Sequence, residues 1–197
     1  MARPKSEDKR DALLAAATRV VAAQGLSAPT ALIAREAGVS SGSLFTYFET
    51  KADLFNQLYL ELKTEMAAAS LAGRAAGDPL REQFARMWSN WMGWATANPD
   101  HRRTLALLDV SDEVGAAARA ASHEAMLEVA LLVERARARG PLREAPMAFV
   151  VALMNSLADT TMDFMVSDPA QADEHCRDGF DALMRVLGDL FFRPIND

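Results

Sequence analysis

The sequence predicts an all-helical protein, and three observations support this fold class. Residues with high helix propensity, above all alanine and leucine, are plentiful along the chain. No stretch of strand length alternates between β-branched and polar residues, whereas apolar residues recur at helical spacing. Glycines and prolines divide the chain into segments of helical length. We therefore expect about nine helices, near residues 6–24, 29–37, 41–48, 51–72, 79–97, 99–109, 112–139, 144–166 and 170–192.

Length and composition are those of a globular protein. The chain has 197 residues, of which 50% are hydrophobic and 24% charged, so one or two domains can bury a core. No uninterrupted apolar run approaches the roughly 20 residues that span a bilayer, and no apolar segment typical of a signal peptide follows the basic start. The one cysteine, Cys176, excludes an intramolecular disulfide. We expect a soluble, cytoplasmic protein that makes no membrane contact.

The charge is distributed unevenly along the chain. The net charge of −6 at pH 7 by itself disfavours binding to nucleic-acid phosphates. Residues 1–51 nevertheless carry seven Lys or Arg against five Asp or Glu, a net charge of +2. Residues 52–197 carry fourteen against twenty-two, a net charge of −8. This asymmetry suits a protein that would touch DNA only through its N-terminal part.

Residues 29–54 show the pattern of two short helices joined by a tight turn. Gly38 can adopt the positive φ that such a turn requires, and Ser40 is a good N-cap for the second helix. Leu44 and Phe48, four residues apart, would anchor that helix inward. The side chains left on its outer face are small or hydrogen-bonding: Ser41, Gly42, Ser43, Thr46 and Tyr47. This is the layout of a helix-turn-helix, whose second helix reads bases in the major groove.

The helices on either side of this segment have clear end signals. The first helix, which has apolar Leu13 and Val21 on one side, would end at Gly25 in the left-handed conformation. The fourth helix opens in the style of a capping box, with Asp53 at its third position. Lys51 lies in its first turn, where the helix dipole disfavours a cation. A nearby DNA phosphate would explain a lysine there.

Over about residues 9–60 the chain resembles the TetR family of transcriptional repressors. The residues that carry the resemblance are Ile33, Ala34, Ala37, Gly38, Val39, Ser40, Gly42, Leu44, Tyr47, Phe48, Lys51 and Leu54. The resemblance implies a DNA-binding domain over residues 1–50 and a helical ligand-binding and dimerisation domain over residues 51–197. It also implies the DNA-contacting residues, which would be Thr30, Ser40, Ser41, Gly42, Ser43, Thr46, Tyr47 and Lys51.

Two positions depart from the family pattern. Phe45 stands where the family usually has a phosphate-bonding tyrosine, so that contact would be missing. Pro29 stands near the position of a usual threonine, which leaves Thr30 as the expected polar contact. Neither departure conflicts with the fold.

The helix over residues 79–97 carries more large apolar side chains than one core-facing stripe needs. One interpretation is an ordinary core, and the other is an apolar cavity that binds a small hydrophobic or amphipathic molecule. The candidate ligand-binding residues are Met87, Trp88, Trp91, Met126, Met154, Asn155 and Phe164. The side-chain amide of Asn155 could either orient a ligand or form a hydrogen bond within the protein.

The last two predicted helices indicate a homodimer. Residues 147–157 are apolar nearly all round the helix, and the final helix repeats Phe180, Leu183, Met184, Leu187, Leu190 and Phe191 at helical spacing. Two such helices from each subunit would form a four-helix bundle, which is also how the family dimerises. The alternative is one larger core within a single subunit. A dimer would bind a palindromic site, with half-sites about 34–36 Å or a multiple of that apart.

No catalytic, metal or cofactor site emerges from the sequence. The three histidines, His101, His123 and His175, share no i, i+4 pairing, and no nucleophile elbow, phosphate loop or dinucleotide fingerprint occurs. We therefore expect no enzyme activity and no cofactor. The resemblance implies a repressor that a small hydrophobic or amphipathic effector releases from double-stranded operator DNA. The alternatives are a ligand-independent or partner-controlled DNA-binding protein and an all-helical enzyme.

Overall fold

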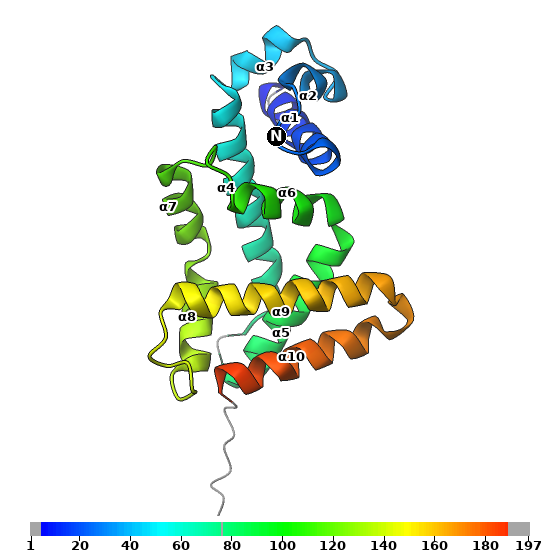
Figure 1. Ribbon diagram of the computed structural model, residues 1–197. Helices are drawn as coiled ribbons and strands as arrows, with labels where there is room; N and C mark the ends of the chain where they lie inside the picture. Colours follow the sequence, from blue (N-terminus) through cyan, green and yellow to red (C-terminus); the bar gives the residue numbers. More distant parts are fainter. Residues whose placement is uncertain (1–4, 76, 189–197) are drawn as a thin grey trace, which may run out of the picture. The chain divides into compact units, whose positions relative to one another are not determined.

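The computed structural model describes residues 5–75 and 77–188. Over these ranges the chain forms ten α-helices and one short 3-10 helix, with no strand, which confirms the all-helical prediction (Figure 1). The α-helices are α1 (Lys5–Gln24), α2 (Thr30–Glu36), α3 (Ser41–Tyr47), α4 (Lys51–Leu71), α5 (Leu80–Ala97), α6 (Pro99–Asp109), α7 (Ala116–Ala125), α8 (Leu127–Arg137), α9 (Met147–Ser167) and α10 (Ala172–Leu187). The 3-10 helix η1 (Pro169–Gln171) lies between α9 and α10.

The prediction of one helix over residues 112–139 was wrong, because two helices occupy this stretch. The chain first makes a turn, in which the Ser111 hydroxyl accepts the Glu113 N–H at 3.1 Å, and α7 begins only after Gly115. A second interruption falls at Met126, whose φ of −90° and ψ of 2° lie outside the helical range. The chain also passes from one compact unit to the other at this point.

The last helix is shorter than predicted. It ends at Leu187, and Gly188 follows with a φ of 111°, a conformation that L side chains rarely adopt. Leu190 and Phe191, which the periodicity assigned to this helix, lie outside the described residues.

The chain divides into two compact units. The first contains the residues up to Glu65 together with Asn98–Ala125, and the second contains Met66–Ala97 and the residues from Met126 onward. The predicted boundary between residues 50 and 51 was based on function and not on packing, and it stays a prediction.

The core of the first unit is built by α1 to α4 and α6. Leu13, Ile33, Leu44 and Phe48 are fully buried in it. Turns of the predicted kind join the helices: Gly25 ends α1 with a φ of 79°, and Gly38 follows α2 with a φ of 70°. Both positive-φ predictions are confirmed.

The core of the second unit is built by α5, α8, α9 and α10, which pack on one another. Helices α9 and α10 lie side by side (Figure 1), and Gly179 of α10 permits this close approach. A Cβ atom on Gly179 would overlap the side chain of Thr161 on α9. The large side chains at the centre of this core are Phe84, Met87, Trp88, Met92, Met154, Phe180, Leu183, Met184 and Leu187.

Candidate nucleic-acid interface

Helix α3 is attached to the first unit by one side only. Leu44 and Phe48 are fully buried, whereas Ser41 and Thr46 are exposed. The cap predicted at Ser40 is confirmed, because its side-chain oxygen accepts the Ser43 N–H at 3.2 Å. Such a cap is worth about 1 kcal/mol, which matters for a helix of only two turns. The buried residues Leu44 and Phe48 and the Ser40 cap together hold α3 so that its remaining surface faces outward.

The outer surface of α3 is lined by small polar groups that bond within the helix. Ser43 and Ser40 share a hydrogen bond between their hydroxyls at 2.8 Å, and Thr46 donates to the Gly42 carbonyl at 3.4 Å. These bonds are local and exposed, so the hydroxyls can exchange them for partners on a base or a phosphate. Gly42 leaves open space beside them, since nothing lies within 4 Å of a Cβ atom built there.

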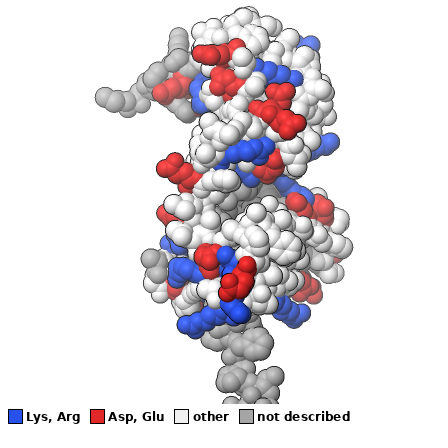
Figure 2. All heavy atoms as spheres, turned by 60° about the vertical axis from the view of Figure 1, so that its left-hand side comes forward, with Lys and Arg blue, Asp and Glu red and all other residues white. Residues whose placement is uncertain are grey.

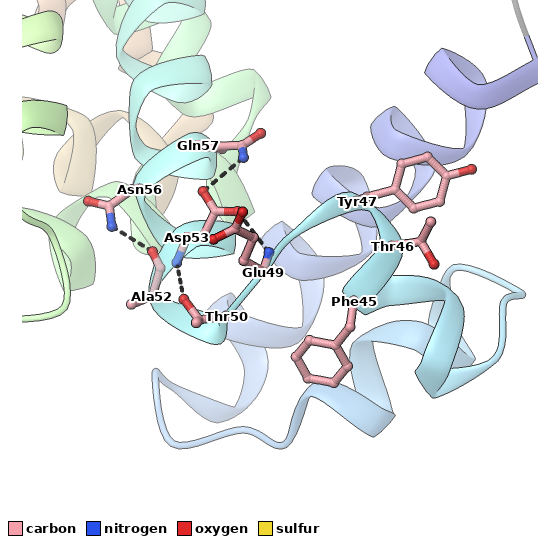
Figure 3. A pocket seen from close by; sticks show the side chains of 9 residues that line it. All are labelled: Phe45, Thr46, Tyr47, Glu49, Thr50, Ala52, Asp53, Asn56 and Gln57. Atoms are coloured by element: carbon pink, nitrogen blue, oxygen red, sulfur yellow. Dashed lines mark hydrogen bonds between the residues drawn. The ribbon is translucent and has the colours of Figure 1, made fainter.

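The turn from α3 to α4 is held by reciprocal hydrogen bonds (Figure 3). Asp53 donates its backbone N–H to Thr50 Oγ1 at 3.0 Å, and its carboxylate accepts the Glu49 N–H at 3.0 Å. The predicted cap is therefore present, although the carboxylate bonds the residue before Thr50 instead of Thr50 itself. This geometry places Tyr47 and Lys51 at the two ends of a stiff turn.

A chain of side chains links this turn to α1. Gln57 donates to Asp53 Oδ1 at 2.9 Å, and its oxygen accepts from Arg10 Nη2 at 2.8 Å. Arg10 and Gln57 were not predicted from the sequence, because 47 residues separate them and no local pattern pairs them. Through Asp53, these two side chains connect α1 to the cap of α4.

Lys51 has a partner within its own helix. Its Nζ atom lies 5.4 Å from the centre of the Phe55 ring, and Phe55 is fully buried. This cation–π contact offsets part of the cost of a cation in the first turn of a helix. The ammonium group is therefore held near the start of α4.

A polar hollow lies between the end of α3 and the start of α4 (Figure 3). Its lining consists of Phe45, Thr46, Tyr47, Glu49, Thr50, Ala52, Asp53, Asn56 and Gln57. The carboxylates of Glu49 and Asp53 make the hollow unfavourable for a phosphate. Among the residues that the structure describes, no group of three His, Cys, Asp or Glu side chains could hold a metal ion.

The remaining predicted contact, Thr30, is the first residue of α2. Pro29 precedes it and provides no side-chain cap, so the first N–H groups of α2 receive no side-chain acceptor from that position. Helices α2 and α3 contact each other. All eight predicted DNA-contacting residues thus lie on the α2–α3–α4 segment of one compact unit.

Charges on this unit are largely balanced at short range. Arg19 lies 3.5 Å from Glu36, and Arg10 lies 3.6 Å from Glu61. On the face shown in Figure 2, basic side chains are interspersed with acidic ones. Exposed pairs of this kind add about 0–1 kcal/mol to stability. On that face the basic side chains form no continuous patch of the kind that binds DNA phosphates without sequence preference.

A second polar cluster joins α4 to α6 and α7 within the first unit. Asp109 accepts hydrogen bonds from Tyr59 at 2.9 Å and from Lys63 at 3.0 Å. Arg119 donates to the backbone oxygens of Asp109 and Ser111 at 3.1 and 2.8 Å. Burial raises the pKa of Tyr59 above its ordinary value of 10.0, and the negative charge of Asp109 adds to this shift.

Comparison with known proteins agrees with this geometry. The family described as bacterial regulatory proteins, tetR family, matches residues 13–58, which contain the whole helix-turn-helix. A crystal structure described as that of a tetR family transcription regulator from Shewanella sp. PV-4 has a TM-score of 0.78 and 30% sequence identity. The match covers 89% of this chain and 95% of that one. This chain belongs to the TetR family. It is a transcription regulator that binds DNA through its helix-turn-helix.

Two further proteins extend the comparison of this TetR-family chain. A curated protein of Haemophilus influenzae, described as an uncharacterized HTH-type transcriptional regulator, is 28% identical over 98 residues. That match covers 49% of this chain and spans about half (52%) of the curated relative. The TetR-like regulator LfrR from Mycobacterium smegmatis, solved in complex with proflavine, shares the fold at 18% identity with a TM-score of 0.61. Its match covers 89% of this chain and 95% of that one.

The candidate ligand-binding residues of this TetR-family protein are only partly brought together. Met87, Trp88 and Met154 are at most 4% exposed and share one apolar cluster, against which the half-buried Trp91 packs. The indole N–H of Trp88 donates to the Cys176 carbonyl at 3.0 Å. The cluster has a packed interior, and its ligand-binding role stays a prediction.

The other three candidates lie outside this cluster. Asn155 is exposed on α9, and Phe164 is 56% exposed, with its ring 5.6 Å from that of His175. Met126 lies at the break between α7 and α8. Periodicity could not separate the inner from the outer face of α9, because nearly every position between residues 147 and 157 is apolar.

Proposed function

We propose that this TetR-family regulator is a homodimeric cytoplasmic repressor. It binds a palindromic operator and is released by a small hydrophobic or amphipathic molecule. The observation that carries the proposal is the outward surface of α3, which buried Leu44 and Phe48 hold in place. A helix presented in this way can enter the major groove without rearrangement of the helix-turn-helix.

Each part of the segment has a role in the proposed complex. Ser41, Gly42, Ser43 and Thr46 face the base edges, where short side chains let the backbone approach closely. Tyr47, Lys51 and Thr30 bond phosphates and fix the register of the protein on the duplex. Ser40 keeps the start of α3 ordered. The proposal includes no enzymatic activity.

Helix α9 supports the homodimer. It is long and apolar enough to cross a membrane by length and composition alone, yet only 28% of its most apolar window is buried within the chain. Its exposed apolar side chains are Phe149, Val151, Phe164 and Val166. A second copy related by a two-fold axis would cover this surface.

Helix α10 contributes differently from the sequence-based expectation. Its apolar residues Phe180, Leu183, Met184 and Leu187 are buried in the core of their own chain. Its exposed side carries charged residues such as Arg177 and Asp181. We therefore propose that α9 supplies the apolar contact of the dimer and that α10 supplies mainly polar contacts beside it.

The effector would bind among the apolar side chains of the second unit. The proflavine complex of LfrR shows that a protein of this fold can hold a flat, amphipathic molecule. In this chain, Trp88, Trp91 and Met154 offer surfaces of the matching kind. Helix α4, which contains residues of both units, would carry the change to the DNA-binding segment. Such coupling is typically worth about 1–3 kcal/mol.

Selection of bound duplexes from random DNA tests the proposal most directly. We expect a palindrome, and binding of one dimer per site in analytical ultracentrifugation. Thermal-shift screening with planar aromatic cations and fatty acids should then reveal a compound that stabilises the protein and weakens operator binding. Absence of any enriched duplex at low salt would contradict the proposal. Enrichment without a compound effect would favour a ligand-independent regulator.

A further inference from the structure

We propose that Phe45 reads the methyl group of a thymine in each operator half-site and thereby determines part of the specificity of this regulator. The inference rests on the proposed role of α3 as the reading helix. It assigns a specific contact to a residue at which the family pattern predicts the loss of one.

The first observation is the exposure of Phe45. Its side chain is 48% exposed, although its neighbour Leu44 is fully buried. Single exposed apolar residues are common on protein surfaces, so the exposure of Phe45 matters here because of its place on the proposed reading helix. Phe45 lies on α3 itself, so its ring belongs to the helix that would enter the major groove in the proposed complex.

The second observation is the surroundings of the ring. In a helix, residue 45 is a neighbour of Ser41, four positions earlier, and of Gly42, three positions earlier. Both neighbours are exposed and small, and a Cβ atom added to Gly42 would have nothing within 4 Å. Phe45 is therefore a large apolar group beside two small exposed residues, and it also contributes to the lining of the hollow between α3 and α4.

Chemistry then selects the group that Phe45 can recognise. A phenyl ring has no hydrogen-bonding atom, so it cannot hold a phosphate in the way a tyrosine hydroxyl does. In the major groove, the base edges display donors and acceptors, and the apolar group among them is the C5-methyl of thymine. Contact with that methyl buries apolar surface on both partners.

Tyr47 complements this assignment from another side of the helix. Figure 3 shows the rings of Phe45 and Tyr47 pointing in different directions from α3, with Thr46 between them in sequence. The Tyr47 hydroxyl can bond a phosphate oxygen, whereas the Phe45 ring can only make apolar contact. The two aromatic residues thus divide backbone positioning from base reading.

The test replaces thymine by deoxyuridine, which removes only the methyl group. The probe is a duplex isolated by selection from random DNA, remade with each thymine of a half-site replaced in turn. For the unmodified protein we expect about fourfold weaker binding at one thymine per half-site, the value of one buried methyl group. The Phe45→Ala protein should bind the thymine duplex more weakly and show no further loss on replacement at that position.

Two controls separate this contact from a general effect. Val110→Ala, at a residue that is 85% exposed and lies outside α3, should keep the fourfold dependence. Phe45→Leu should keep part of it, because leucine retains an apolar surface. Circular dichroism melting should show that the Phe45 variants fold. Equal binding of the unmodified protein at every uracil position would overturn the inference even if they do not.

Several outcomes would overturn the inference alone. These are a selected half-site without thymine, equal binding at every uracil position, or a Phe45→Ala protein that keeps the same dependence. A uniform loss for Phe45→Ala without any uracil effect would place the ring on the sugar–phosphate backbone instead. Failure to select any duplex would overturn the proposed function as well.

Discussion

Arg10 and Gln57 are joined by a hydrogen bond of 2.8 Å from Nη2 to Oε1, with a second donor contact from Nε at 3.3 Å. Gln57 also bonds the cap of α4, because its amide nitrogen donates to Asp53. The first helix of the chain therefore helps to set the turn that presents Tyr47 and Lys51.

Gln57→Ala should weaken this positioning. We expect the free energy of unfolding to fall by about 1 kcal/mol, as for the loss of a typical hydrogen bond, and operator affinity to fall several-fold. Urea denaturation and fluorescence anisotropy with a selected duplex measure the two effects. Thr64→Ala, on the exposed side of the same helix, is the matched control and should change neither. Unchanged affinity for Gln57→Ala would limit this residue to a role in stability.

Lys51→Ala should weaken binding to all sequences alike. Loss of one phosphate contact reduces the slope of log K against log salt concentration by about 1. Titrations at several salt concentrations with two unrelated duplexes measure this slope. Arg103→Ala, which removes an exposed cation of α6, should leave the slope unchanged. Equal binding by Lys51→Ala and unmodified protein at every salt concentration would exclude the phosphate contact.

Thr46→Ala should alter site preference instead of general affinity. The side chain is exposed and bonds only weakly to the Gly42 carbonyl, so we expect a stability change within about 0.5 kcal/mol. Loss of a base contact would cost about 1–3 kcal/mol at one position of the site and leave the others unaffected. Repeated selection from random DNA with the variant detects this change. An identical consensus for both proteins would remove Thr46 from the reading surface.

Phe164→Asp should prevent dimer formation. Burying a carboxylate in an apolar interface is strongly unfavourable, whereas an exposed residue in a monomer tolerates it. Analytical ultracentrifugation should then show a folded monomer that binds the palindrome poorly. Val110→Asp introduces the same charge at an exposed apolar residue away from α9 and should remain dimeric. A Phe164→Asp dimer would place the interface elsewhere.

Tyr59 should make stability depend on pH above about 10. Its folded pKa is raised above 10.0, first by burial, so the folded state holds the phenol proton more tightly than the unfolded state. The stabilisation is fully present below the unfolded pKa and decreases as the pH rises through the folded pKa. Urea denaturation at about pH 9 and about pH 11 should show a smaller decrease for Tyr59→Phe than for the unmodified protein. Tyr47→Phe is the control, and a decrease in Tyr59→Phe equal to that of the unmodified protein would contradict this account.

The helix-turn-helix and the helices beside it could be predicted because the residues that determine them lie close together in the sequence. Gly25 and Gly38 end their helices in a conformation that few other residues adopt, and Ser40 bonds a backbone group only three residues away. Leu44 and Phe48 lie on one side of α3 by helical geometry alone. The family resemblance could be recognised for the same reason, because it depends on residue types at fixed short spacings.

The second unit was less predictable for a related reason. Residues 147–157 of α9 are apolar on nearly every side, so periodicity assigns no inner face to Asn155 or Phe164. The break at Met126 follows no glycine or proline, and no residue pattern marked it.

The sequence by itself determined the helical fold class, the helix-turn-helix and its caps, since each depends on residues within about four positions of one another. Only the tertiary structure decided that Arg10 supports the turn through Gln57, that α10 turns its apolar side into its own core, and that Phe45 stands exposed on α3. Those features depend on which distant surfaces meet, and the packing of separate helices has no short-range pattern in the chain.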